Sequence, residues 1–579
     1  MAQILNFYRR CSLCAIGYFL VFAGVSDPTF AQSTAPSSIT PQTLRPDVTG
    51  NGAPVAVPKS DGLRTPSGAE GIRVALGSVD LEGGYGEVAT QTTAVADSLT
   101  KSRVSLDQIY AAASEIEAIH ARAGYVLVRA AVPPQSLSDG GILRIIIVDG
   151  FIESVDVSGL PARARKSVAD RTAKLIGQRH MKLSALERPI LIASEVPGLV
   201  MTSTLARGTE FSGARLILAG NQKLISGSIV GDNSLAAALG RYGISAQASI
   251  NSAFGQGEQI YGFASSGYDL TKLLRQDNPV RVIGGGVMLP FGDGRFSINP
   301  ELTFARTQPM SQIGTPQTRG NLSRLSLRAS YIMFKARSFN LALDTALEHL
   351  DETIDAPMFN ARISRDRFTV ARIGFRLNSI EPKGGNMFLS GQISQGVGGA
   401  PIAIDMAPGS GFSRLGSDTD FTKLNLSFRA VSSVAKKWQL NIIAKGQTTF
   451  GAVVFRSEQS ALEGSDALSA FVGGITAVDE SVTIRIELER PFYARAANKT
   501  QLAPYGFIAA GYGRINNPTA LENENLHAAS FGAGLRISIP KIGFGGLGLA
   551  LGLEYARGVA DFLPDRHRDR LNATMSLRF

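Results

Sequence analysis

The sequence predicts an all-β transmembrane barrel of about sixteen antiparallel strands, preceded by two small α+β domains. Three observations lead to this fold class. The chain begins with an export signal, no later apolar run is long enough for a transmembrane helix, and short alternating strands recur up to the last residue. Glycine accounts for 62 of the 579 residues and hydrophobic residues for 44%, a composition that suits an exported β-barrel.

The first 31 residues predict a cleaved signal peptide. Arg9 and Arg10 precede the apolar run 11–25, and a small-x-small pattern ends at Ala31. The run is shorter than the roughly 20 residues that a membrane-spanning helix needs. Both cysteines of the chain lie in this run, so we expect a mature protein without disulfides or thiol chemistry.

Residues 32–70 predict a Pro/Ser/Thr-rich linker, because its prolines are too closely spaced for a long helix. Two compact α+β domains are expected next, over 71–158 and 159–221. In the first, Ser105 can cap a helix over 105–124 that ends at Gly124. The other expected elements are strands at 74–83, 125–132, 141–150, 151–159, 198–206 and 213–220, and helices near 162–176 and 183–194.

Residues 222–579 predict the barrel. Stretches such as 325–331 and 482–490 alternate apolar and polar residues, as a strand with one apolar face does. Alternation alone also fits a soluble barrel with its apolar face inward, but the export signal and the even strand number favour the membrane form. The expected strands begin near residues 223, 242, 257, 280, 295, 322, 338, 367, 386, 422, 437, 482, 503, 528, 546 and 571.

The last strand, "LNATMSLRF" at 571–579, alternates up to the final residue. In a closed barrel this strand pairs with the first one, so that no edge remains. Phe579 then lies at the membrane interface, where aromatic residues form a girdle. The end of the chain resembles the C-terminal signal that is read when outer-membrane proteins are inserted.

No pattern in the sequence predicts an enzyme or a cofactor site. The five histidines, His120, His180, His349, His527 and His567, lack the spacing of metal ligands. Nucleophile, phosphate-loop and paired-carboxylate motifs on suitable turns are also missing. The basic stretch 175–182 is isolated, so nucleic acid is not an expected partner, and the net charge of +10 fits several kinds of partner.

Three segments carry a resemblance to a known family. The block "GYVLVRAAVPPQSLSDGGILRIIIVDGFIESVDVSG" at 124–159 resembles the first POTRA domain of two-partner-secretion transporters, the TpsB family of ShlB-, FhaC- and HecB-like haemolysin and haemagglutinin activators. Residues 194–216 resemble the second POTRA domain, and 231–260 the start of the barrel. The matching positions are Gly124, Tyr125, Arg129, Pro134, Gln135, Gly140, Gly150, Pro197, Gly198, Asp232, Asn233, Gly240 and Asn251.

The resemblance implies a transporter in the outer membrane of a Gram-negative bacterium, with its POTRA domains in the periplasm. Such a transporter captures an unfolded exoprotein, an adhesin, haemolysin or contact-inhibition toxin, and moves it through the barrel without ATP. Outer-membrane lipid and the barrel-assembly machinery are the other implied partners. A membrane-protein assembly factor of the same superfamily, or a passive porin, remains the alternative. The implied substrate-binding residues are Tyr125, Arg129, Gln135 and Arg144.

One departure from the family concerns a loop that its members fold into the barrel lumen. That loop carries Val-Arg-Gly-Phe/Tyr at its tip, and the arginine pairs with the aspartate of a Phe-x-Asp-x-Gly strand. Here the loop tip aligns as Leu468, Ser469, Ala470 and Phe471, and the strand as Phe507, Ala509 and Gly511. Ser469 and Ala509 thus stand where the ion pair would be. We expect a loop held against an apolar wall without that pair; the alternative is that the loop aligns differently.

Overall fold

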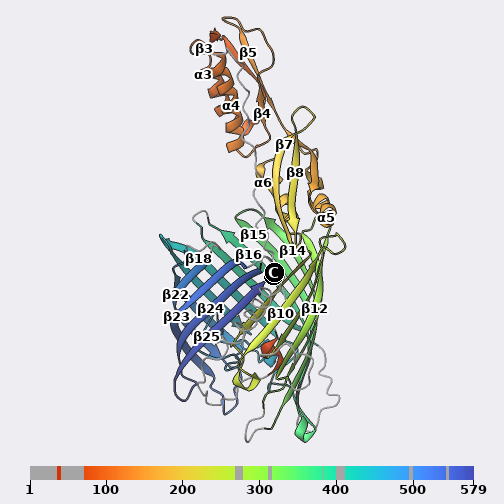
Figure 1. The fold of residues 1–579 in the computed structure, drawn as a ribbon, viewed down its shortest axis with the longest axis vertical. Coiled ribbons are helices and arrows are strands. Elements are labelled where there is room, and N and C mark those ends of the chain that lie inside the picture. Colours follow the sequence, from red (N-terminus) through yellow and green to blue (C-terminus); the bar gives the residue numbers. More distant parts are fainter. Residues whose placement is uncertain are drawn as a thin grey trace, which may run out of the picture.

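The computed structural model describes residues 35–40, 71–267, 278–310, 316–381, 384–398, 411–494, 500–542 and 547–579. Two small α+β modules follow one another above a barrel, and the chain passes from the second module directly into the barrel (Figure 1). The expected signal peptide, 1–31, and the expected linker, 32–70, lie outside the described residues except for 35–40. No helix in the described part of the chain is long and apolar enough to cross a membrane.

The first module packs two helices on one face of a three-stranded sheet of order β2-β5-β4. Ser105 caps α4, because its Oγ accepts from Gln108 N–H while the Gln108 side chain accepts from Ser105 N–H. The helix buries Ile109 and Ile116 against Leu143 and Ile145 of the sheet. The elements are β1 Arg73–Val74, β2 Ser78–Gly83, η2 Gly86–Val88, α3 Ala89–Ser98, β3 Val104–Ser105, α4 Leu106–Arg122, β4 Arg129–Ala131 and β5 Ile142–Val148.

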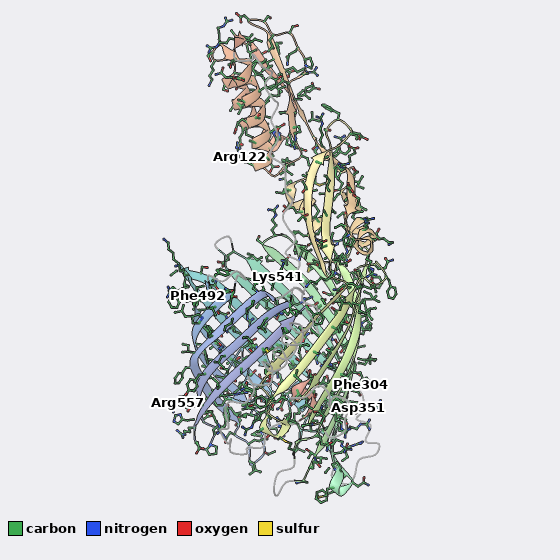
Figure 2. The ribbon with its side chains drawn as sticks, viewed as in Figure 1. Arg122, Phe304, Asp351, Phe492, Lys541 and Arg557 are labelled. Carbon is green, nitrogen blue, oxygen red and sulfur yellow. The ribbon has the colours of Figure 1, made fainter. Side chains whose placement is uncertain are left out.

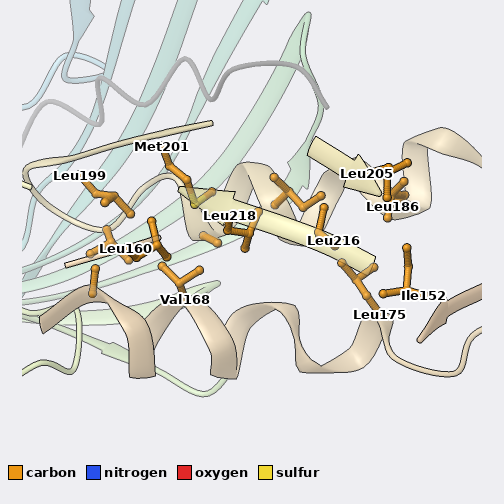
Figure 3. Packing of buried hydrophobic residues seen from close by; sticks show 14 of the residues in the cluster. Ile152, Leu160, Val168, Leu175, Leu186, Leu199, Met201, Leu205, Leu216 and Leu218 are labelled. Carbon is orange, nitrogen blue, oxygen red and sulfur yellow. The ribbon is translucent and has the colours of Figure 1, made fainter. Parts of the chain in front are cut away.

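The second module repeats this plan with a sheet of order β6-β8-β7 and helices on one face. In both modules one edge strand runs parallel to the middle strand and the other antiparallel. Leu160, Val168, Leu186, Leu216 and Leu218 form a continuous apolar core between helices and sheet (Figure 3). The elements are β6 Phe151–Gly159, α5 Ala162–Thr172, η3 Ala173–Leu175, α6 Leu183–Ala193, β7 Leu199–Arg207 and β8 Gly213–Gln222.

The barrel is closed and has sixteen antiparallel strands, in agreement with the predicted fold class. The expected strand starts agree closely with the observed ones; the largest difference is at β16, expected from 367 and observed from Ala361. The strands are β9 Ile225–Asp232, β10 Gly243–Asn251, β11 Gln259–Ser266, β12 Val280–Phe291, β13 Phe296–Thr307, β14 Arg319–Lys335, β15 Phe339–Ala356, β16 Ala361–Ile380, β17 Asn386–Val397, β18 Thr422–Ala435, β19 Trp438–Thr448, β20 Glu480–Glu489, β22 Gln501–Arg514, β23 Asn525–Ile542, β24 Leu547–Ala560 and β25 His567–Arg578, with the two-residue β21 Phe492–Tyr493 beside β22.

The exposure of the two faces of the barrel wall shows whether the apolar side of the strands faces outward or inward. Large apolar side chains such as Leu302, Phe304 and Leu325 are exposed on the outside, while Glu301 and Arg324 on the same strands are buried on the inside. Figure 2 shows Phe304 on the outer face of the wall, toward the end far from the modules. A soluble barrel would show the reverse arrangement, so the structure supports the membrane form.

The last strand closes the barrel. β25 pairs with β9 only over Thr574–Arg578 and Ser228–Asp232, whereas β15 and β16 pair over the full length of β15. Phe579 extends this seam by two backbone hydrogen bonds with Gly227, of 3.0 and 3.2 Å. A Cβ at residue 227 would lie 2.5 Å from Phe579 Cζ, so glycine is needed there to admit the terminal ring.

Candidate functional site: the barrel lumen and its loop

The segment between β19 and β20 folds back into the lumen. Its tip packs Leu468, Ala470 and Phe471 in an apolar cluster with Phe507 and Ala509 of β22. Two wall glycines make room for the tip: a Cβ at Gly511 would lie 2.9 Å from Leu468 Cδ1, and one at Gly558 2.6 Å from Phe471 Cζ. The structure therefore brings together the loop tip and the strand that the sequence analysis paired.

The wall beside Ser469 is not apolar, which corrects our expectation. Arg485 of β20 is fully buried there, and its Nη1 donates to Ser469 Oγ at 2.9 Å. The same guanidinium binds Glu487 at 2.8 Å and Glu554 of β24 at 2.5 Å, and its Cζ lies 3.6 Å from the centre of the Phe507 ring. Ala509 is the register partner of Arg485 on the next strand. The loop tip is thus held by a cation that belongs to the wall.

Sequence reasoning placed Arg485 and Glu487 on the polar face of one strand but did not connect them with the loop. The usable signal was the Arg-x-Glu spacing, which puts both side chains on the lumen side of β20. The contact with Glu554 could not be read from the chain, because it depends on the barrel register and joins residues 69 positions apart.

A second ionic cluster holds the beginning of the same segment. Glu458, in η7 (Arg456–Glu458), is buried and accepts from Arg372 at 2.6 Å and from Lys423 at 2.5 Å. Arg372 also binds Glu348 of β15 at 2.8 Å. Because Glu458 and Glu348 each have a cation, the charges of this cluster are compensated. The segment is therefore fastened to the wall at its beginning and at its tip.

Residues 35–40, which we expected to belong to a linker, lie inside the barrel. They contain α2 (Pro36–Ile39), a short helix that contacts β13, β14 and η7. Glu352 of β15 accepts from Ser37 N–H at 2.8 Å and from Ser37 Oγ at 3.0 Å. Pro36 is buried against Gly320, where a Cβ would lie 2.5 Å from Pro36 Cδ. No local pattern in the sequence predicts this contact.

The remaining space in the lumen is a cavity of about 1530 Å³. Charged and polar side chains line it together with parts of α2 and of the lumen loop, among them Arg324, Arg328, Asp344, Arg536 and Arg570. Among the described residues, no group of three His, Cys, Asp or Glu side chains is placed to hold a metal ion. The cavity is a polar space that α2 and the loop share and partly fill.

The four residues of the first module that we expected to bind substrate divide into two groups. Tyr125 is buried: its ring stacks on Tyr85 at 3.9 Å, and its hydroxyl donates to Glu87 at 2.8 Å. Arg129 lies on β4, Arg144 on β5 and Gln135 on their connection; the register partner of Arg129 is Val148, four residues along β5 from Arg144. Gln135 binds the backbone N–H and C=O of Arg144, both at 2.9 Å, and Arg144 pairs with Glu82.

Tyr125 belongs instead to the joint between the modules. Lys182 of the second module donates to both oxygens of Glu87, at 3.0 and 3.2 Å, and Tyr85 donates to Asp149 at 2.6 Å. The bond from Lys182, followed by that from Tyr125, holds the pKa of Glu87 below its ordinary value. Burial, and then the bond to Asp149, raises the pKa of Tyr85. Both the ring and the hydroxyl of Tyr125 are engaged in this joint.

Comparisons with known proteins agree with this architecture. Residues 216–537 match the family model of the haemolysin secretion/activation proteins ShlB/FhaC/HecB, and residues 74–150 match the ShlB-type POTRA domain. The chain belongs to this family. It is an outer-membrane transporter of two-partner secretion, with a POTRA domain ahead of a sixteen-stranded barrel.

Among its relatives is the heme/hemopexin transporter protein HuxB of Haemophilus influenzae, 21% identical over 75% of each chain. Among solved structures, CdiB from Escherichia coli has a TM-score of 0.65 at 17% identity, covering 90% of this chain and 94% of its own. CdiB from Acinetobacter baumannii has a TM-score of 0.55 at 13% identity, covering 100% and 98%. BamA from Haemophilus ducreyi without POTRA domains 1–3 has a TM-score of 0.51 at 12% identity, covering 88% and 100%.

Proposed function

We propose that this transporter captures one dedicated unfolded exoprotein with its two modules and passes it through the barrel lumen as an extended chain. The observation that carries the proposal is the polar lumen of about 1530 Å³, occupied in part by α2 and by a loop fastened with buried ion pairs. These elements obstruct the path while no cargo is present, and their polar contacts can be exchanged for contacts with a passing chain.

The proposed capture surface is the sheet of the first module. β2 is an edge strand there, and a strand edge can add an extended segment by backbone hydrogen bonds. Ile142 is 64% exposed on the face opposite the helices, next to the half-exposed ion pair Arg144–Glu82. Arg129, Gln135 and Arg144 remain proposed substrate contacts on this sheet, whereas Tyr125 takes a joint-forming role.

The proposed domain organisation follows the sequence analysis, except that residues 35–40 of the linker form α2 in the lumen: a signal peptide at 1–31, a linker at 32–70, POTRA domains at 71–158 and 159–221, and the barrel at 222–579. The POTRA domains are proposed to lie in the periplasm. Phe579 at the barrel seam is proposed as part of the signal that the barrel-assembly machinery reads. The exoprotein would be an adhesin, haemolysin or contact-inhibition toxin, and no catalytic role is proposed.

The deciding experiment removes residues 71–220 and keeps the N-terminal segment and the barrel. The truncated protein and the full chain are each expressed with a candidate exoprotein encoded beside the gene. We expect the truncated barrel to insert, as judged by heat-modifiable migration on gels, but the exoprotein to stay in the cells. Exoprotein in the medium at the level of the full chain would refute capture by the modules.

The likeness to BamA keeps one alternative open to test, because that fold match covers 88% of this chain. As an assembly factor, the protein would insert other outer-membrane proteins and release nothing to the medium. The same strains distinguish the two functions: secretion predicts loss of one extracellular product, whereas assembly predicts a general fall in outer-membrane proteins.

A further inference from the structure

Three arginines form a patch on the outside of the barrel, at the end far from the modules. They are Arg281 on β12, Arg306 on β13 and Arg319 on β14. Arg281 and Arg306 are direct register partners. Arg306 faces Asn321, which lies two residues from Arg319 and therefore on the same face of β14. We call Arg281, Arg306 and Arg319 the arginine patch.

The arginine patch lacks acidic partners among the described residues. The register partners of Arg306 are Arg281 and Asn321, and its one described side-chain bond goes to Gln308 at 3.4 Å. No ion pair joins Arg281 or Arg319 to a described acidic residue. Asp355, the register partner of Arg319, binds Arg362 instead, at 2.9 Å. Like charges directly opposite in a sheet are destabilising, so an anion between them would stabilise this wall.

Other outward arginines at this end of the barrel are paired. Arg365 binds Asp351 at 2.7 Å, Arg514 binds Glu524 at 2.8 Å, and Arg557 lies 3.6 Å from Asp569. Asp351 is on the outside of the wall near Phe304, and Arg557 is on the opposite wall (Figure 2). Arg365 is partly buried like the patch arginines, Arg514 and Arg557 are more exposed, and all three differ from the patch in having a carboxylate. Outward position alone therefore does not explain the unpaired charges.

The arginine patch sits at the boundary of the apolar belt. Ile283 follows Arg281 on the same face of β12, and Phe304 precedes Arg306 on β13; both apolar side chains are exposed. Leu325 continues the belt on β14. A lipid whose acyl chains lie on this belt would place its headgroup beside the three guanidinium groups. With the modules on the periplasmic side, as the proposed function has it, this headgroup belongs to the outer leaflet.

We propose that the arginine patch binds the phosphate groups of the glycolipid of the outer leaflet, lipid A. Guanidinium groups form paired, charge-assisted hydrogen bonds with phosphate. The phosphorylated disaccharide of lipid A supplies the missing anion, and its acyl chains cover Ile283, Phe304 and Leu325. On the opposite wall, Arg557 already has Asp569 as its partner.

The experiment compares the patch variant R281Q/R306Q/R319Q with the matched variant R365Q/R514Q/R557Q in the full-length, detergent-solubilised protein. Binding of bisphosphorylated lipid A is titrated by native mass spectrometry. We expect the patch variant to bind at least about tenfold more weakly and the matched variant to stay within about twofold of wild type. Equal loss in both variants, or no loss in the patch variant, would overturn the proposal.

Two further arms identify the recognised group. Lipid A without phosphates should bind to wild type as weakly as bisphosphorylated lipid A binds to the patch variant; tight binding would show that the phosphates are not recognised. Millimolar inorganic phosphate should not displace lipid A, and displacement would indicate a site for free anions instead. If the triple variant fails to fold, R306Q replaces it, and R306K, which keeps the charge but loses the paired hydrogen bonds, is expected to bind lipid A more tightly than R306Q and more weakly than wild type.

Thermal unfolding measures two opposite effects of the arginine patch: repulsion without lipid A and stabilisation with it. Without lipid A, the patch variant should unfold at the wild-type temperature or above, because repulsion between the arginines is removed. With lipid A, only wild type and the matched variant should gain stability. A patch variant that gains as much as wild type would refute the site. Exoprotein release is scored separately, so failure of the lipid site and failure of the proposed secretion function can be told apart.

Discussion

At the scale of single residues, Arg485 is the side chain on which the lumen loop depends most. It is fully buried and compensates Glu487 and Glu554 while it donates to Ser469 at the loop tip. Removing one partner of a buried ion pair leaves an uncompensated charge, which costs far more than losing an exposed pair.

We expect Arg485→Met to destabilise the barrel by about 3–5 kcal/mol, because Glu554 stays buried without a cation and Glu487 keeps only its bond from Arg536, at 2.9 Å. The exposed pair of Arg429 with Asp466, at 2.9 Å, provides the control. Arg429→Met should cost no more than about 1 kcal/mol. Urea unfolding followed by heat-modifiable migration measures both. Similar losses in the two variants would mean that Arg485 does not hold a buried ionic cluster.

The cation can also be moved from the wall to the loop. Ser469→Arg alone should destabilise, because a second guanidinium would lie beside Arg485; Arg485→Ser alone should destabilise for the reason given above. The double variant restores one cation between Glu487 and Glu554. It should be more stable than the sum of the single effects predicts, by about 1 kcal/mol or more. Additivity within about 0.5 kcal/mol would show that residue 469 does not reach the two carboxylates.

At the scale of elements, α2 and the lumen loop share the cavity. Deleting residues 35–40 removes the contacts of Ser37 with Glu352 and of Pro36 with Gly320. We expect higher single-channel conductance in planar bilayers than for the full chain. Glu352→Gln, which weakens the same contact without shortening the chain, should give more frequent openings. A conductance unchanged in both variants would mean that α2 does not limit the path.

Some elements can be predicted from the sequence and others cannot. Alternation places the barrel strands, and Ser105 marks the start of α4, because both are local signals. The helix α3 was not expected, since its three threonines are weak helix formers and its burial against the sheet decides its state. The lumen contacts of Arg485 and Ser37 depend on which strands face each other across the barrel. Tyr125 was assigned to substrate on the family resemblance, and its stacking on Tyr85 could not be foreseen because it is a tertiary contact.

At the scale of the whole molecule, the two modules differ in how firmly they are held. The second module is bound to turns of the barrel by ion pairs of Glu195 with Lys335 and of Glu187 with Arg337, and by Lys174 with Asp293 at 3.1 Å. The joint between the modules relies on Glu87 with Lys182 and on aromatic stacking. The first module is therefore the part that a change in solution conditions can release from the second module.

The pKa of Glu87, lowered by Lys182, gives the joint a defined pH dependence. A lowered carboxyl pKa adds stability above the ordinary value of 4.5, and this contribution is lost as the pH falls through the lowered value. We expect spin labels at Thr93→Cys and Arg163→Cys, in a chain without other cysteines, to give a narrow distance distribution at pH 6 and a broad one at a pH below the lowered pKa of Glu87. Adding Glu87→Gln should broaden the distribution at both pH values; a narrow distribution at pH 6 in that variant would contradict the role of Glu87.

The short pairing between β9 and β25 also determines where the barrel opens when a mechanical force is applied. Peeling a strand breaks its hydrogen bonds one after another, so the work needed to open a seam grows with the number of paired residues. Pairing over Thr574–Arg578, extended by Phe579 on Gly227, is brief beside the pairing of β15 with β16. If the chain is pulled from its C-terminal end, the barrel should therefore open first between β25 and β9, while the long strands β14–β16 stay paired.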